Sequence, residues 1–136
     1  MYLVDTNVIS EARKGKNAHP GVVQFFRSTQ PVERYLSVQT VGEIRRGIEN
    51  IRHRGDQQHV LRLERWLDAV VAEYANRILS FDIDCSQIWG GLMSPQASHP
   101  IDKQIAAIAL IHGLQVVTRN VSDFSTTGVN LLNPFT

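Results

Sequence analysis

Short apolar runs alternate along the chain with longer stretches whose apolar residues recur every three to four positions. The short runs predict strands at residues 2–4, 35–38, 78–81 and 115–118, with a further short edge strand within 129–132. The longer stretches predict helices over residues 8–14, 21–27, 40–54, 57–76, 82–93 and 102–112. Strands that alternate with helices are typical of an α/β fold in which helices cover both faces of a parallel sheet.

Two of the predicted helices differ in how their apolar residues are distributed. Over residues 57–76 these residues form a single stripe, so one face of the helix should be buried. The stripe consists of Leu63, Trp66, Leu67, Val70, Val71 and Tyr74. Over residues 102–112, apolar side chains occupy every position from 105 to 111. A helix that is apolar on nearly all sides is expected in the middle of a fold.

Length and composition exclude several classes of protein. The chain has 136 residues, a formal net charge of +1, 43% hydrophobic and 20% charged residues, and one cysteine, Cys85. This predicts a single ordered domain, residues 1–136, and excludes a protein that coats nucleic acid through charge alone. One cysteine excludes an internal disulfide framework, and no Cys/His spacing typical of structural zinc is present. The longest apolar run, 105–111, is shorter than the roughly 20 residues of a membrane span, so we expect a cytoplasmic protein without membrane contact.

The acidic residues carry the clearest functional signal, because four of them fall near predicted strand ends or helix starts. Asp5 directly follows the first strand, and Glu43 lies in the first turns of the helix after the second. Asp102 opens the apolar helix, and Asp123 follows the fourth strand by five residues. Since ligands of open α/β sheets bind at the carboxyl ends of the strands, we expect these four carboxylates at one edge. Such a cluster suits Mg²⁺ or Mn²⁺, which can activate water and stabilise charge on a phosphate.

Each acid also has a purely structural interpretation. Asp102 and Asp123 could cap helices, and Glu43 could be a surface residue paired with Arg46. Asp5 is harder to explain in this way, because it ends an apolar strand. The coincidence of four such positions favours a site over four independent structural roles.

Four segments of the chain resemble the signatures of PIN domains, and more closely those of the VapC and FitB-like toxins of bacterial type II toxin–antitoxin systems. They are LVDTNV at 3–8, VGEI at 41–44, DKQIAA at 102–107 and VTRNVSDF at 117–124; IWGGL at 88–92 is also similar to a segment of those toxins. The resemblance implies a three-layer α/β/α fold around a central, mostly parallel twisted sheet of four to five short strands.

The resemblance also implies an activity and a set of site residues. The activity is that of a ribonuclease in which a Mg²⁺- or Mn²⁺-bound water attacks the RNA phosphodiester in line. The implied metal-binding and catalytic residues are Asp5, Glu43, Asp102 and Asp123, and the implied supporting polar residues are Thr6, Asn7, Thr118 and Asn120. The chain departs from the family pattern at Ile108, where Thr is common, and at Gly91, where Arg is commoner. Lys103 beside Asp102 is a further oddity.

The expected partners are RNA and a small antitoxin of the VapB or FitA-like type, with the toxin forming a homodimer, or a heterotetramer and larger assemblies with the antitoxin. Arg45 and Arg46 begin an arginine-rich stretch, 45–65, that could guide RNA towards the acids. The alternative for this stretch is a solvated helical face of mixed charge.

Three other functions remain open from the sequence. One is a phosphoryl-transfer protein of the haloacid-dehalogenase or receiver type, which also places Asp after a first strand; the former would have Asp where this chain has Asn7. Another is a binding module whose acids have lost metal affinity. The last is a PIN nuclease of RNA processing rather than a toxin.

Overall fold

The computed structural model describes all residues, 1–136. Five strands form one parallel sheet with the order β3-β2-β1-β4-β5. The strands are β1 (Tyr2–Val4), β2 (Arg34–Ser37), β3 (Ile78–Leu79), β4 (Gln115–Val117) and β5 (Leu131–Leu132). The helices are α1 (Thr6–Ala12), α2 (Pro20–Ser28), α3 (Val38–His53), α4 (Gln57–Tyr74), α5 (Ile83–Leu92), α6 (Pro100–His112) and α7 (Val121–Phe124), and single 3₁₀ turns lie at Gly15–Asn17, Pro31–Glu33 and Ala75–Arg77.

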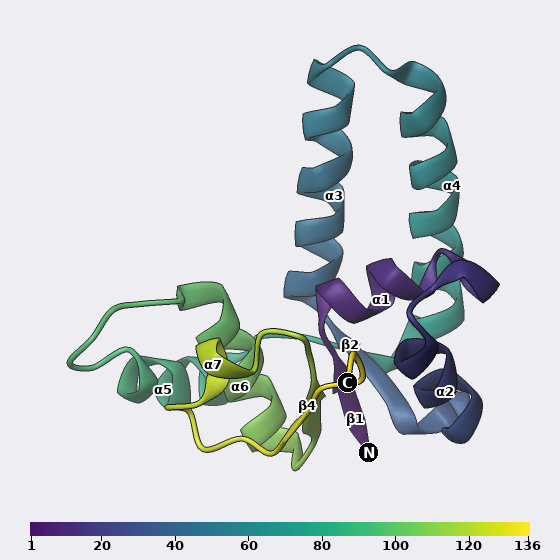
Figure 1. Ribbon diagram of the computed structural model, residues 1–136. Coiled ribbons are helices and arrows are strands. Elements are labelled where there is room, and N and C mark those ends of the chain that lie inside the picture. The colour runs from purple at the N-terminus through teal and green to yellow at the C-terminus, as the bar shows by residue number, and fades with distance from the viewer.

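Helices cover both faces of the sheet, which gives three layers. Successive strand residues point to opposite faces, so Val4 and Val117 pack with α1 to α4, whereas Leu3 and Val116 pack with α5 to α7. Figure 1 shows α5, α6 and α7 together on one side of the strands and α1 and α2 on the other. The predicted α/β/α fold with a parallel sheet is confirmed.

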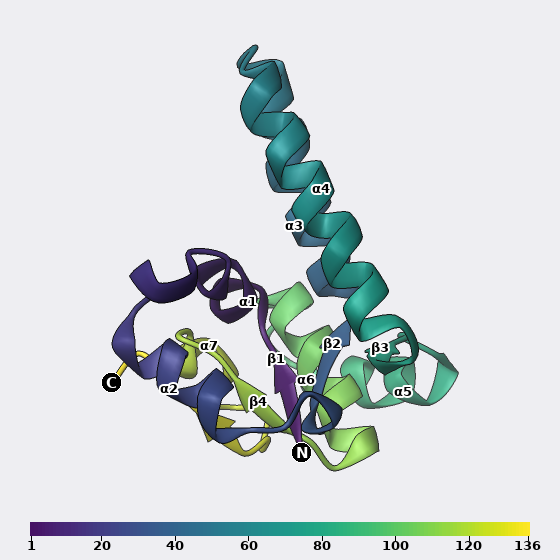
Figure 2. The same cartoon turned by 90° about the vertical axis from the view of Figure 1, so that its right-hand side faces the viewer.

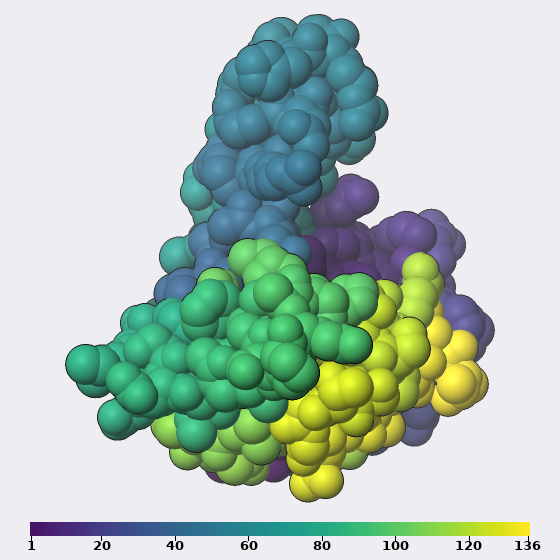
Figure 3. Space-filling view, turned by 90° about the vertical axis from the view of Figure 1, so that its left-hand side faces the viewer, coloured from purple at the N-terminus to yellow at the C-terminus, as the bar shows by residue number.

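Helices α3 and α4 form a long antiparallel hairpin that stands out from the rest of the molecule (Figures 2 and 3). Its tip is the short turn 54–56, where Gly55 has a φ of 89°, a conformation that favours glycine. The buried stripe of α4 consists of Val60, Leu63, Leu67, Val70 and Tyr74.

The predicted stripe of α4 was too wide. Val71 is 39% exposed, and Trp66 is only partly buried against the core. Trp66 and Val71 lie on either side of the buried face, in the half of α4 nearer the sheet, so only a narrow stripe is buried and the residues at its margins meet solvent.

Helix α6 packs through its middle against the sheet, as its apolar composition predicts. Residues 105–109 are fully buried, whereas Leu110 and Ile111 are about two-fifths exposed at the end of the helix. The observed strands β3 and β5 are shorter than the runs 78–81 and 129–132, because backbone pairing with a neighbouring strand is limited to two residues each.

The chain end packs closely on α2 at Gly21. A Cβ atom at this position would overlap the backbone carbonyl of Pro134, so the contact requires glycine. No helix of the structure combines the length and apolar character needed to cross a lipid bilayer.

Candidate active site

The four predicted acids come together at the carboxyl edge of the sheet. Asp5 follows β1 and caps α1, Glu43 lies on α3, Asp102 lies in the first turn of α6, and Asp123 lies on α7. The negative charges of Asp5, Asp123 and Glu43 all act on the Asp102 carboxyl. Residues that are far apart in the sequence therefore form one acidic site.

Asp5 is the buried and firmly held member of the site. Its side chain is almost inaccessible; Oδ1 accepts a hydrogen bond from the Thr6 amide at 2.8 Å, and Oδ2 accepts one from the Thr118 hydroxyl at 2.8 Å. The amide of Asn7 approaches the same oxygen at 3.4 Å. Burial raises the pKa of Asp5, the hydrogen bonds from Thr118 and Thr6 lower it, and the charge of Glu43 raises it again.

Glu43 is exposed and is held by a single contact. The Thr6 hydroxyl donates to Glu43 Oε1 at 2.6 Å, and lies 3.0 Å from the hydroxyl of Thr40. Thr6 therefore links the carboxylates of Asp5 and Glu43, one through its backbone amide and the other through its side chain.

The remaining predicted polar residues brace this arrangement. Asn7 accepts a hydrogen bond from the Arg119 amide at 3.0 Å and lies 3.3 Å from the Thr118 hydroxyl, which joins α1 to the end of β4. Asn120 contributes through its backbone only: its amide donates to the Thr118 hydroxyl, and its carbonyl accepts from the Asp123 amide, both at 3.0 Å. The Asn120 backbone thus lies beside Thr118 and Asp123, while its side chain forms no hydrogen bond within the protein.

Asp102 has the strongest electrostatic perturbation of the four acids. Partial burial, together with the charges of Asp5, Asp123 and Glu43, raises the pKa of Asp102 from 3.8 to about 6, and nearby His99 opposes the rise. Its carboxylate accepts no hydrogen bond from the protein. Because charge repulsion and partial desolvation act on it without such compensation, a bound cation would stabilise its ionised form.

His99 was not predicted from the sequence. Its Nε2 lies 3.7 Å from Asp123 Oδ1, and one potential ligand atom each from His99, Asp102 and Asp123 lie within 4.8 Å of one another. Asp5 and Glu43 lie outside this compact group. The only sequence signal for His99 was its place three residues before the segment that begins at Asp102.

The side chains at this edge fit a hard divalent cation. Carboxylate oxygens are the ligands that Mg²⁺ and Mn²⁺ prefer, and such ions keep several waters when only a few protein ligands reach them. Burial and repulsion between the acids raise the pKa values of Asp5 and Asp102, so a cation would relieve an unfavourable arrangement of charge. The residues present therefore fit a divalent cation.

The two arginines predicted to guide RNA differ in their surroundings. Arg45 Nη1 lies 2.8 Å from Glu64 and 3.4 Å from Glu49, and Arg52 binds the same two glutamates. Arg46 is exposed and forms no ion pair. The hairpin thus carries a mixed-charge face from its middle towards its tip, and Arg46 is the free cation of the pair.

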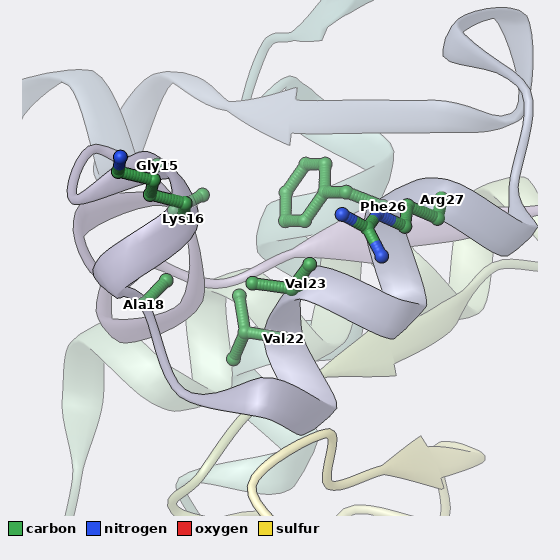
Figure 4. Close-up of a pocket in the computed structure, with 8 residues that line it drawn as sticks. Gly15, Lys16, Ala18, Val22, Val23, Phe26 and Arg27 are labelled. Atoms are coloured by element: carbon green, nitrogen blue, oxygen red, sulfur yellow. The ribbon is translucent and has the colours of Figure 1, made fainter.

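A separate hollow of about 410 Å³ lies between α2 and the end of α1 (Figure 4). Val22, Val23 and Phe26 of α2 face the segment that carries Lys16 and Ala18. No carboxylate lines this hollow, so it is not part of the acidic site.

Comparison with known proteins finds a family match over nearly the whole chain. The model of the PIN domain matches residues 2–129. Plasmid stability protein StbB of Pseudomonas syringae pv. tomato is 39% identical over 143 residues, with 99% of each chain covered. VapC ribonuclease Y4jK of Sinorhizobium fredii is 33% identical, covering 99% of this chain and 98% of its own, and toxin FitB of Neisseria gonorrhoeae is 34% identical, covering 99% of each.

The solved structures agree with this assignment. The structure of FitAcB from Neisseria gonorrhoeae superposes with a TM-score of 0.84 at 34% identity, over 99% of both chains. The fold, the acidic edge and the sequence similarity all lead to the same assignment: this chain belongs to the PIN domain family.

Proposed function

We propose that the protein is a divalent-metal-dependent endoribonuclease and the toxin of a toxin–antitoxin pair. The observation that carries this proposal is the convergence of four carboxylates from four chain segments, with the pKa of Asp102 raised to about 6 by burial and by the other three. The carboxylates of such a cluster repel one another when no cation is bound, and a bound divalent cation offsets this repulsion.

The side chains at the site have separable roles in this proposal. When bound, Mg²⁺ or Mn²⁺ supplies a water of lowered pKa and positive charge beside the scissile phosphate. Asp102 and Asp123 would hold the ion. Asp5, fixed at both oxygens by Thr6 and Thr118, would keep its orientation as RNA enters.

Glu43 is placed for a different task. It is the most exposed of the four acids, and Thr6 holds its Oε1, so Oε2 can face substrate and solvent. A carboxylate in this position would accept a proton from the attacking water or help to hold the ion.

The relatives support RNA as the substrate and toxicity as the role. Y4jK is named a VapC ribonuclease, FitB a toxin and StbB a plasmid stability protein. We propose accordingly that a small antitoxin of the VapB or FitA-like type binds this chain, and that the chain forms a homodimer. The similar structures of FitAcB and of FitAB bound to DNA support an assembly of this kind.

The test is cleavage of total cellular RNA by the purified protein in Mg²⁺, in Mn²⁺ and in EDTA, beside Asp5→Asn. Asparagine also caps helices, so the variant should fold normally and lose nearly all cleavage. Asp68→Asn, at an exposed acid of α4, is the matched control and should cleave normally. Cleavage that persists in EDTA, or that survives Asp5→Asn, would refute the proposed mechanism.

The toxin role has its own measurement. Induced expression of the wild type without its partner should arrest growth, whereas Asp5→Asn should not. Normal growth with soluble wild-type protein present would exclude toxicity. It would not affect the nuclease activity, which the cleavage assay tests separately.

A further inference from the structure

His99 occupies a position that neither the four acids nor the capping of α6 explains. Its Nε2 is 3.7 Å from Asp123 Oδ1, and it forms a compact group of potential ligand atoms with Asp102 and Asp123. It is the residue before the first turn of α6, yet its side chain makes no capping hydrogen bond. The imidazole is directed instead towards the two carboxylates.

The backbone at His99 is strained. With a φ of 51° and a ψ of 56°, it is the only non-glycine residue of the chain in the left-handed region. For a residue with a Cβ this conformation costs about 1–2 kcal/mol, and such strain persists only when the surrounding structure maintains it. Strained residues of this kind cluster at functional sites.

Lys103 provides that support. It is 97% buried, and its Nζ donates to the Gln96 carbonyl at 3.0 Å and to the Ser98 hydroxyl at 3.3 Å, without an acidic partner. Its backbone amide donates to the His99 carbonyl at 3.0 Å. A buried ammonium is costly unless hydrogen-bonded, so these contacts fix the segment 96–99 against α6.

The chemistry of this group differs from that of an all-carboxylate site. Oxygen ligands alone suit Mg²⁺, whereas an imidazole nitrogen favours Mn²⁺ and the later first-row metals over Mg²⁺. Resting on the proposed function, we propose that His99 supplies a nitrogen ligand to the divalent cation held by Asp102 and Asp123, and that it makes this site prefer Mn²⁺ to Mg²⁺.

An alternative in which His99 is not a ligand gives a different result. If His99 serves only to pair with Asp123, a neutral imidazole adds nothing to metal binding, and its removal should leave metal binding equal or tighter. The two roles therefore predict different metal affinities, and they can be separated without measuring cleavage.

The experiment is Mn²⁺ binding by the full chain without RNA at about pH 8, where an ordinary imidazole is neutral. Free Mn²⁺ is followed by electron paramagnetic resonance, and electron spin echo modulation reports nitrogen coupled to the bound ion. The variants are His99→Asn and His99→Gly, because both residues accept a positive φ and lack the imidazole. His53→Asn, at the far end of α3, is the control.

The wild type and His53→Asn should show nitrogen coupling, and both His99 variants should lose it. Mn²⁺ affinity should fall at least about tenfold in the His99 variants, and Mg²⁺ affinity should fall much less. Bound Mn²⁺ without nitrogen coupling in the wild type, or equal or tighter binding by the variants, would overturn the role of His99 alone. A wild type that binds neither ion would overturn both this inference and the proposed function.

Discussion

Neutralising Asp102 should stabilise the metal-free protein at neutral pH. The pKa of this carboxyl is about 6 in the folded chain and 3.8 ordinarily, so folding favours its protonated form. The contribution of this carboxyl to the free energy of unfolding is fully present below its ordinary pKa and is lost as the pH rises through about 6. Asp102→Asn removes a charge that the fold opposes.

The size of the effect follows from the same shift. A difference of about 2 pKa units corresponds to an upper limit of about 3 kcal/mol. Because Asp102 is partly exposed, solvent screening reduces this to about 1–2 kcal/mol. Loss of a favourable charge at the N-terminus of α6 removes a further 0.3–1 kcal/mol or so. We therefore expect Asp102→Asn to raise the free energy of unfolding by about 1 kcal/mol, and Tm by about 3–5 °C.

The assay is thermal unfolding in EDTA between about pH 5 and pH 8, with Asp84→Asn as the control. Asp84 also lies in the first turn of a helix, α5, but outside the acidic site. The Tm difference between Asp102→Asn and wild type should grow as the pH rises, and Asp84→Asn should show no such gain.

In saturating Mg²⁺ or Mn²⁺ the wild type should instead have a higher Tm than Asp102→Asn. A ligand at 100 times its Kd stabilises the folded state by about 2.7 kcal/mol, and only the wild type should gain this. If Asp102→Asn melts at or below the wild-type temperature in EDTA throughout the pH range, the argument from charge repulsion is wrong.

Three other variants test separate parts of the structure. Thr118→Val should lower the free energy of unfolding by about 1–3 kcal/mol and move the pH profile of cleavage upwards, because Asp5 loses a hydrogen bond that lowers its pKa; an unchanged profile would contradict this role. Glu64→Gln should leave Tm nearly unchanged but strengthen RNA binding and steepen its salt dependence, because two arginines of the hairpin lose a counter-charge; unchanged binding would place RNA elsewhere. Gly21→Ala should destabilise the fold by about 1–3 kcal/mol, since the added Cβ meets backbone, whereas Gly47→Ala on open helix surface should stabilise it by about 1 kcal/mol; equal effects in chemical denaturation would refute the close packing at the chain end.

Much of the fold could be predicted because its signals are local. The periodicity of α4 and the apolar run of α6 each depend on neighbouring residues of one segment, and both helices lie close to their predicted bounds. Helix α7 could not be predicted in this way, because four residues are too few to show a period. The length of β3 depends on how far β2 extends beside it, which is a tertiary property.

Some features of the site could likewise be predicted from the sequence, and others could not. The convergence of the acids could be predicted, because parallel strands carry whatever follows them to one edge of the sheet. The position of His99 could not, since it depends on a strained backbone and on the buried contacts of Lys103. The pairing of Arg45 with Glu64 could not be predicted from the sequence either, because the two residues meet only when α3 packs on α4.

The hairpin tip at Gly55 divides the chain into two parts, neither of which holds a complete site. The part before the tip carries Asp5 and Glu43 with strands β1 and β2, and the part after it carries Asp102 and Asp123 with the other three strands. The order β3-β2-β1-β4-β5 places the strands of the first part between those of the second. Two separately produced fragments would each be inert, and joining them through fused binding partners would rebuild the acidic edge. The exposed turn at the tip is therefore a natural point at which to make this protein a split reporter or a conditional nuclease.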